Sequence, residues 1–282
     1  MSSINTNVSA MVALQSLNKT NAALETAQKR ISTGYRVGSA EDNAAYWSIA
    51  TTMRSDNSAL STVKDALGLG AATIDVAYTA TNSAIDVTKE IKNKLVAARQ
   101  PGVDRAKIQS EITELQNQLQ SIGDSAVFSG QNWLSDDSSA AGYNATKSIV
   151  ASFTRSGGAI SIGTISIDTS NTLLYDAGAA GVGIIDGLRD ATGAIGATGT
   201  SVAALDISAL TDSAADTTIL EAHIARADTA ISEMTDSASL LGASKQRVGL
   251  QKNFVSALMD AVDRGISALV DADMTEESTK LQ

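Results

Sequence analysis

Residues 216–269 read DTTILEAHIARADTAISEMTDSASLLGASKQRVGLQKNFVSALMDAVDRGISAL, and their apolar residues recur every seven positions. The main row consists of Leu220, Ala227, Met234, Leu241, Val248, Val255, Val262 and Leu269. A second row, which Lys245 and Lys252 interrupt, contains Ile224, Ile231, Ala238, Met259 and Ile266. Rows with this spacing form the contact seam of an α-helix that packs along another helix. At about 1.5 Å per residue this helix would be roughly 80 Å long, so it requires an equally long partner.

The partner helix is predicted at residues 42–99, with Ser39 as its N-cap and Asp42 in the place of a capping-box glutamate. One of its rows is mostly large and contains Leu60, Leu67, Ile74, Thr81, Thr88 and Leu95. The other is mostly small and contains Val63, Gly70, Ala77, Ala84, Ile91 and Ala98. Small residues allow a neighbouring helix to approach closely. The two long helices therefore match in length and in pattern.

A third helix is predicted at residues 105–122, because Pro101 and Gly102 end the second helix and Asp104 can cap the next. Its apolar seam is Ile108, Ile112, Leu115, Leu119 and Ile122. The short connection indicates that this helix folds back antiparallel on the second one.

The N-terminal segment is predicted to be a helix at residues 5–32 with a narrow apolar row, which contains Met11, Leu14, Leu17, Leu24 and Ile31. A single helix of this kind is marginal in water, so we expect it to become ordered when another helix packs on it. The alternative is a frayed terminus.

The middle of the chain has a different pattern. Residues 148–155 and 159–168 alternate apolar and polar side chains around Ser156-Gly157-Gly158, which indicates a β-hairpin. Residues 171–211 are rich in Gly, Ala and Thr, with a short helix expected near Ile184 to Arg189. The predicted fold is mainly α: an elongated antiparallel coiled-coil-like bundle with a small β-rich variable insertion at 135–214. Because all three bundle helices lie outside 138–212, we expect the bundle to fold without that segment.

Composition narrows the class of protein. The 282 residues include no Cys and one Pro, and aromatic residues make up 4% of the chain. A net charge of −10 argues against nucleic acid as the main partner. No apolar run has the length of a membrane span, so no membrane insertion is expected. The first twenty residues lack the features of a cleavable signal peptide, so an exported chain would need another route.

The residues that could carry chemistry are few. His223 is the only histidine, and Glu221 and Asp228 lie near it on the same predicted helix. A zinc site is conceivable there, but we interpret His223 as a surface residue. The Gly-rich stretch 193–201 lacks the lysine of a phosphate-binding loop. We therefore expect no catalytic residues, no metal and no cofactor.

Three further stretches are STGYRVGSAEDNAAYWSIATTMRSDNSAL at 32–60, SGQNWL at 129–134 and LVDADMTEESTKLQ at 269–282. All three resemble stretches of bacterial flagellins. The resemblance covers roughly 1–135 and 216–282, and the first two stretches look like the short alphaproteobacterial members. It implies a secreted structural subunit that polymerises into the extracellular flagellar filament for swimming motility. A hook–filament junction protein and a secreted coiled-coil adhesin or effector remain as alternatives.

The same resemblance implies a division of the chain. Residues 1–33 would be the N-terminal half of the inner filament core, and 34–134 and 215–270 the two parts of a helical domain. Residues 135–214 would be the variable surface insertion, and 271–282 the start of the C-terminal core helix. The implied partners are other copies of the chain, the filament cap and junction proteins, and an export chaperone with the flagellar export apparatus. Flagellins usually continue past the position of Gln282 as an apolar helix. We therefore expect the first helix to be uncovered and the isolated chain to be monomeric, with 1–33 disordered.

Overall fold

The computed structural model describes residues 7–178 and 182–281, and it is mainly α-helical, as the sequence predicts. Its helices are α1 (Val8–Thr33), α2 (Ala44–Ala97), α3 (Arg105–Ser125), α4 (Ala214–Val270) and α5 (Met274–Leu281), with a 3₁₀ helix η1 (Val202–Ala204). The chain divides into two compact units, which are described separately. Unit 1 contains residues 1–62, 155–160 and 254–282, and unit 2 contains 63–154 and 161–253. The predicted start of the first helix at residue 5 lies outside the described residues.

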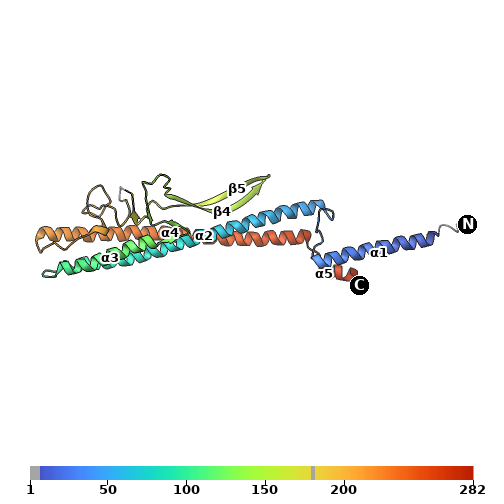
Figure 1. Ribbon diagram of the computed structural model, residues 1–282, viewed down its shortest axis with the longest axis horizontal. Helices are drawn as coiled ribbons and strands as arrows, with labels where there is room; N and C mark the ends of the chain where they lie inside the picture. The colour runs from blue at the N-terminus through green and yellow to red at the C-terminus, as the bar shows by residue number, and fades with distance from the viewer. Residues whose placement is uncertain (1–6, 179–181, 282) are drawn as a thin grey trace. The chain divides into compact units, whose positions relative to one another are not determined.

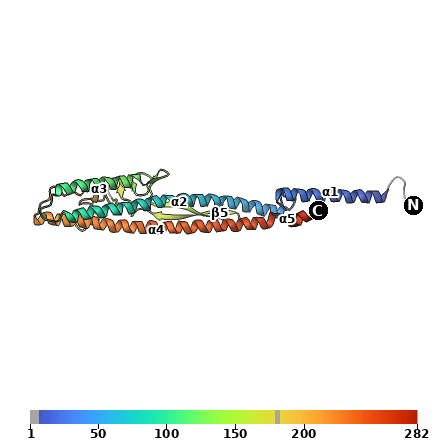
Figure 2. The same cartoon turned by 90° about the horizontal axis from the view of Figure 1, so that it is seen from below.

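Unit 2 is a bundle in which α2 from residue 63, α3, and α4 up to residue 253 run side by side (Figures 1 and 2). The heptad rows predicted from the sequence point into it, because Leu67, Ile74, Leu241 and Val248 are all fully buried. The buried Thr81 and Thr88 fit the apolar interior by donating their hydroxyls to the carbonyls of residues 77 and 84. Two ion pairs on the outside, Lys92–Asp228 and Lys245–Asp75, join α2 to α4, and a third, Arg99–Glu221, joins the turn after α2 to α4.

Unit 1 contains the first turns of α2 and the last turns of α4. Val37, Ala50, Ile266 and Val270 form its small core, against which Met53, Val262 and Leu269 are partly buried. A Cβ on Gly265 would lie 2.9 Å from Cε of Met53, so the glycine allows the two helices to approach. At the hairpin tip, Arg155 donates to the Asp56 carboxylate at 2.8 Å.

The start of α2 differs from the prediction. The cap is Asn43, whose side chain accepts a hydrogen bond from the Tyr46 amide, and the helix begins at Ala44. Asp42 faces the preceding turn instead and accepts from the amides of Gly38 and Ser39. Ser39 therefore does not cap the helix. Asp104 does cap α3, since its side chain accepts from the Lys107 amide.

The predicted hairpin is confirmed as β4 (Thr146–Ser156) and β5 (Ala159–Asp168), which pair around Gly157 and Gly158. Both glycines have positive φ, 57° and 87°, as a two-residue turn of this kind requires. The other strands are short: β1 (Val127–Phe128) pairs antiparallel with β2 (Gln131–Asn132), and β3 (Ser135–Asp136) pairs parallel with β6 (Tyr175–Asp176).

The short helix expected near residues 184–189 is not there. Residues 184–186 form a turn, and Arg189 makes isolated β-bridges with Ile195 and Thr200. The reason is nonlocal, because the buried Arg189 guanidinium donates to the carbonyls of Ile184 and Gly193 and to the Glu233 carboxylate on α4.

The middle segment shares its core with the helices, contrary to the expectation that they are independent of it. Tyr175 packs directly on Gly123 of α3. A Cβ on Gly123 would lie only 2.7 Å from Cδ2 of the tyrosine. The Gln116 amide on α3 donates to the carbonyls of Val202 and Leu205. The buried apolar residues of this segment outside the hairpin are Leu173, Leu174, Tyr175, Ile184, Ile185, Val202, Leu205 and Ile207.

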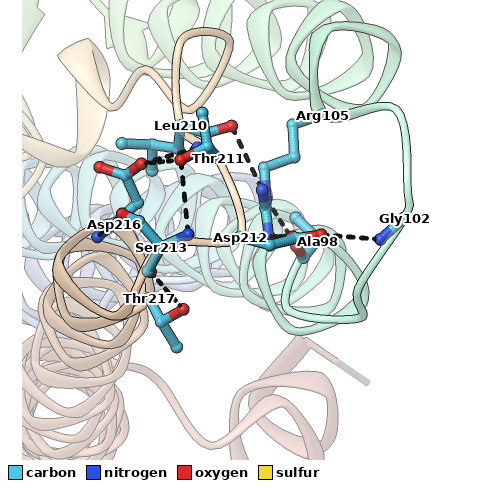
Figure 3. A network of polar contacts seen from close by, with 9 residues as sticks. All are labelled: Ala98, Gly102, Arg105, Leu210, Thr211, Asp212, Ser213, Asp216 and Thr217. Atoms are coloured by element: carbon cyan, nitrogen blue, oxygen red, sulfur yellow. Dashed lines mark hydrogen bonds and ion pairs between the residues drawn. The ribbon is translucent and has the colours of Figure 1, made fainter.

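A polar network closes the end of unit 2 where α2 turns into α3 (Figure 3). Arg105 donates to the Ala98 carbonyl at 3.0 Å, to the Leu210 carbonyl at 3.2 Å and to the Asp212 carboxylate at 2.7 Å. The other Asp212 oxygen accepts from the Gly102 amide. Arg105 thus joins the α2–α3 turn to the segment that leads into α4.

Candidate functional site

Exposed apolar side chains gather on the first turns of α1. Its exposed side chains are Val8, Met11, Val12, Leu14 and Leu17, each exposed by 57% or more. All of them except Leu17 line a shallow groove together with Gln15, Asn18 and Lys19. An apolar patch of this size on a folded chain marks a surface that another molecule covers.

The α1 helix begins and ends with well-defined caps. The Asn7 side chain accepts from the amides of Ser9 and Ala10, and Gly34 ends the helix at φ 76° with its amide bonded to the Arg30 carbonyl. A left-handed residue of this kind is the common end of a helix and favours glycine.

At its C-terminal end α1 contacts α5, as Figure 1 shows. Ala27 is buried there, and Arg30 pairs with the buried Glu277 carboxylate at 3.0 Å. Lys280 pairs with the same carboxylate, and hydrogen bonds to Lys280 and Arg30 hold the pKa of Glu277 below its usual value. The Gly34 carbonyl also accepts from the Ala272 amide. The C-terminal helix α5 therefore packs against the C-terminal end of α1.

The sequence-predicted residues separate into three groups by burial. Those that are buried are Leu60, Leu67, Ile74, Ile112, Leu119, Leu220, Met234, Leu241, Val248 and Val255. Those that are half-buried are Ile31, Ile108, Leu115, Val262 and Leu269. Only Leu14, Leu17 and Leu24 are exposed, and all three are on α1. The structure thus divides one predicted set into bundle residues and candidate assembly residues.

Two residues of the exposed face, Val8 and Val12, were missed by the heptad reading of the first helix. A heptad row selects one narrow stripe. The face is broader because Val8, Met11 and Val12 follow the spacing of three and four that defines a helix face.

His223 is buried, which corrects the prediction of a surface residue. Its Nδ1 lies 2.8 Å from the Arg226 guanidinium, whose Nε donates to the carbonyls of Arg189 and Asp190. Burial and the neighbouring Arg226 charge lower the pKa of His223 to about 4, so the imidazole is neutral near pH 7. It is therefore part of the polar contact between α4 and the middle segment.

The two carboxylates near His223 in the sequence form ion pairs with other residues. Glu221 pairs with Arg99, and Asp228 pairs with Lys92. Within residues 7–178 and 182–281, no three His, Cys, Asp or Glu side chains are grouped as metal ligands would be. None of the helices described is both long enough and apolar enough to span a bilayer.

A helical bundle that leaves a wide apolar face uncovered on its terminal helix is the kind of subunit that assembles with copies of itself. Residues 4–139 match the family model for the bacterial flagellin N-terminal helical region, and residues 224–282 match the C-terminal helical region. Flagellin C of Rhizobium meliloti (strain 1021) is 50% identical over the whole chain and 91% of the relative. Flagellin A of Rhizobium meliloti is 40% identical over the whole chain and 93% of the relative.

A flagellin of Brucella melitensis biotype 1 is 38% identical over the whole chain and 89% of its own length. The chain belongs to the flagellin family and is a structural subunit of the bacterial flagellar filament. The alternatives of a junction protein and an adhesin are not favoured by these relatives.

Proposed function

We propose that the chain polymerises through the exposed apolar face of α1, which another part of the filament covers. The observation that supports this most is the exposure of Met11, Val12 and Leu14, each about 60% accessible on one helix. Burying a large apolar side chain fully contributes about 1.5–3 kcal/mol. Because the same contact would repeat along a filament, every subunit would be stabilised by this burial.

The packing of α5 on α1 indicates which side of α1 remains for assembly. Ala27 and Arg30 face α5, whereas the exposed row lies on the preceding turns. In this proposal residues 1–33 and 271–282 belong to the inner core of the filament. Residues 34–134 and 215–270 form the helical domain, and 135–214 the variable insertion.

Further partners follow from the same proposal. A chain that grows a filament outside the cell requires an export chaperone, the flagellar export apparatus, and cap and junction proteins at the filament ends. The role is structural and non-enzymatic. It needs no cofactor, and its working residues are contact surfaces.

The test is seeded filament growth by the variant Leu14→Asp. We expect growth to be abolished, because the charge would be buried in the assembled core without a partner. The free subunit should keep its melting temperature, since Leu14 is 61% exposed. Electron microscopy measures filament length, and circular dichroism measures the fold.

The matched control is Ser16→Asp, which adds the same charge on the side of the α1 helix away from Leu14. We expect this variant to grow filaments. Equal growth by Leu14→Asp and wild type would show that this face is not the assembly surface.

A further inference from the structure

A small pocket of about 260 Å³ lies in unit 1, where α1 ends and the chain turns toward α2. Its charged lining consists of Lys29 and Arg30 on α1, Arg36 in the connecting segment and Asp42 before α2. The pocket is separate from the apolar groove on the preceding turns of α1.

The negative charges at this pocket are already engaged. Asp42 Oδ2 accepts from the amides of Gly38 and Ser39 at 2.9 and 3.0 Å, and these hydrogen bonds hold the pKa of Asp42 below its usual value. The Glu277 carboxylate pairs with Arg30 and Lys280. Both carboxylates are therefore ionised and hydrogen-bonded near pH 7.

Hydrogen-bond donors remain in excess. Arg36 donates one guanidinium N–H to the Leu269 carbonyl at 3.0 Å. The Lys29 ammonium makes no hydrogen bond or ion pair with another residue that the structure describes, although its charge helps to lower the pKa of Asp42. Lys29 and Arg36 together carry one more charge than Asp42 neutralises, so the pocket has room and donors for one more anionic group.

The rest of the chain is rich in such groups. Residues 1–40 carry Lys19, Lys29, Arg30 and Arg36 but only Glu25 as an acid, whereas the whole chain has a net charge of −10. The N-terminal segment of one copy is therefore opposite in charge to the remainder of any other copy. Opposite charges of this kind steer two copies together and fix their register.

We propose that this pocket receives an Asp or Glu carboxylate from a second copy of the chain in the filament. The inference rests on the proposed assembly into filaments. Lys29 and Arg36 donate to the incoming carboxylate. The pair fixes register, while the apolar face of α1 supplies most of the contact.

The direct test is zero-length cross-linking in filaments grown from an equal mixture of ¹⁴N- and ¹⁵N-labelled full chain. A carbodiimide joins the Lys29 ammonium to a contacting carboxylate as an amide, and the reagent takes up the water that is lost. We expect mass spectrometry to find Lys29 joined to an Asp or Glu peptide of the other isotope, in filaments and not in monomers.

A second measurement uses the critical concentration for seeded growth. At low salt we expect Lys29→Gln to raise it several-fold and Lys29→Arg to leave it near wild type, because Arg keeps the charge. Added NaCl should reduce the difference, since salt screens the pair. The control is Lys107→Gln, which removes a lysine whose side chain is 85% exposed on α3 and should have no effect.

Filaments in which Lys29 forms no amide with another copy, and in which Lys29→Gln grows as wild type at low salt, would overturn this inference and leave the proposed function intact. Inorganic phosphate could instead protect the Lys29 amine from chemical modification in monomers, while no cross-link forms in filaments. That result would overturn this inference and show that the pocket binds a small anion. Failure of wild type to polymerise would overturn the proposed function and this inference together.

Discussion

At the scale of single residues, Arg105 illustrates how one side chain joins the α2–α3 turn to the segment that leads into α4. Its side chain is 8% exposed, and its donors reach two segments, one at Ala98 and the other at Leu210 and Asp212. Its hydrogen bond to Asp212 holds the pKa of that carboxyl below the usual value. The junction is therefore ionised and paired near pH 7.

We expect Arg105→Met to lower the free energy of unfolding by about 2–4 kcal/mol, because the carbonyls of Ala98 and Leu210 and the Asp212 carboxylate lose their donor. Urea denaturation followed by circular dichroism measures this. The control is Arg99→Met, since the Arg99–Glu221 pair has both side chains about half exposed and should contribute about 0–1 kcal/mol. Equal effects of the two substitutions would contradict the role of Arg105.

His223 makes stability depend on acid. Its folded-state pKa of about 4 lies below the unfolded value of 6.5, so the unfolded chain binds the proton more tightly between these values. The stability contribution is present above about pH 6.5 and is lost as the pH falls toward 4. The full loss is about 3 kcal/mol.

We expect His223→Gln to flatten the fall in stability between pH 6.5 and 4.5, measured by urea denaturation at each pH. Asp186 has the opposite sign, because burial raises its folded-state pKa, so it cannot cause this fall. An unchanged slope in the variant would show that other groups determine the acid sensitivity.

At the scale of elements, α2 contains two glycines with different roles. A Cβ on Gly70 would lie 2.6 Å from Cγ2 of Ile149 on β4, whereas a Cβ on Gly68 would have only Lys252 Nζ within reach, at 3.9 Å. Gly70 therefore allows the hairpin to pack on the helix. Gly68 has no such neighbour and only weakens the helix.

We expect Gly68→Ala to raise the free energy of unfolding by up to about 1 kcal/mol. Gly70→Ala should lower it by about 1–3 kcal/mol, because the Ile149 side chain branches at Cβ and cannot move aside freely. Thermal melts compare the two. The double variant Gly70→Ala/Ile149→Ala removes the clash, so it should cost no more than Ile149→Ala alone. A stabilising Gly70→Ala would contradict this packing.

The helices could be predicted from the sequence because their signals are local and repeated. The row from Leu220 to Val255 and the cap at Asp104 each depend on residues within a few turns. The start of α2 differs from its predicted position because Asp42 and Asn43 are both good N-cap residues. Only the hydrogen bonds of the preceding turn distinguish them.

At the scale of the whole molecule, the parts that could not be predicted are those held by contacts between distant residues. No sequence pattern around Arg189 predicts its burial, yet it is fully buried and donates to the Glu233 carboxylate, 44 residues further along the chain. His223 looked like a surface residue because the segment that covers it has no periodic pattern. The candidate pocket at Lys29 depends in the same way on how α1 and the segment before α2 fold together.

The middle segment is the strongest case, because the sequence predicts that it is dispensable and its packing indicates otherwise. Leu174, Ile185, Val202 and Ile207 are each essentially inaccessible to solvent, and α3 and α4 supply the other side of these contacts through Gln109, Gln116 and Arg226. Removing residues 138–212 would expose helix surfaces that are now covered.

We therefore expect a chain in which a short Gly/Ser linker replaces 138–212 to melt on the order of 10 °C or more below wild type, with a broader transition. The control deletion removes only the hairpin, 146–168. Its flanking residues already meet, since the Thr169 amide donates to the Ala145 carbonyl at 2.8 Å, so a short linker closes the gap without strain. The hairpin also exposes Ile160 and Ile162, so its loss uncovers less of the core. Circular dichroism melts compare the melting temperatures of the two deletion variants. Equal melting temperatures would mean that the hairpin alone stabilises the helices, and that residues 170–211 pack on them without contributing to stability.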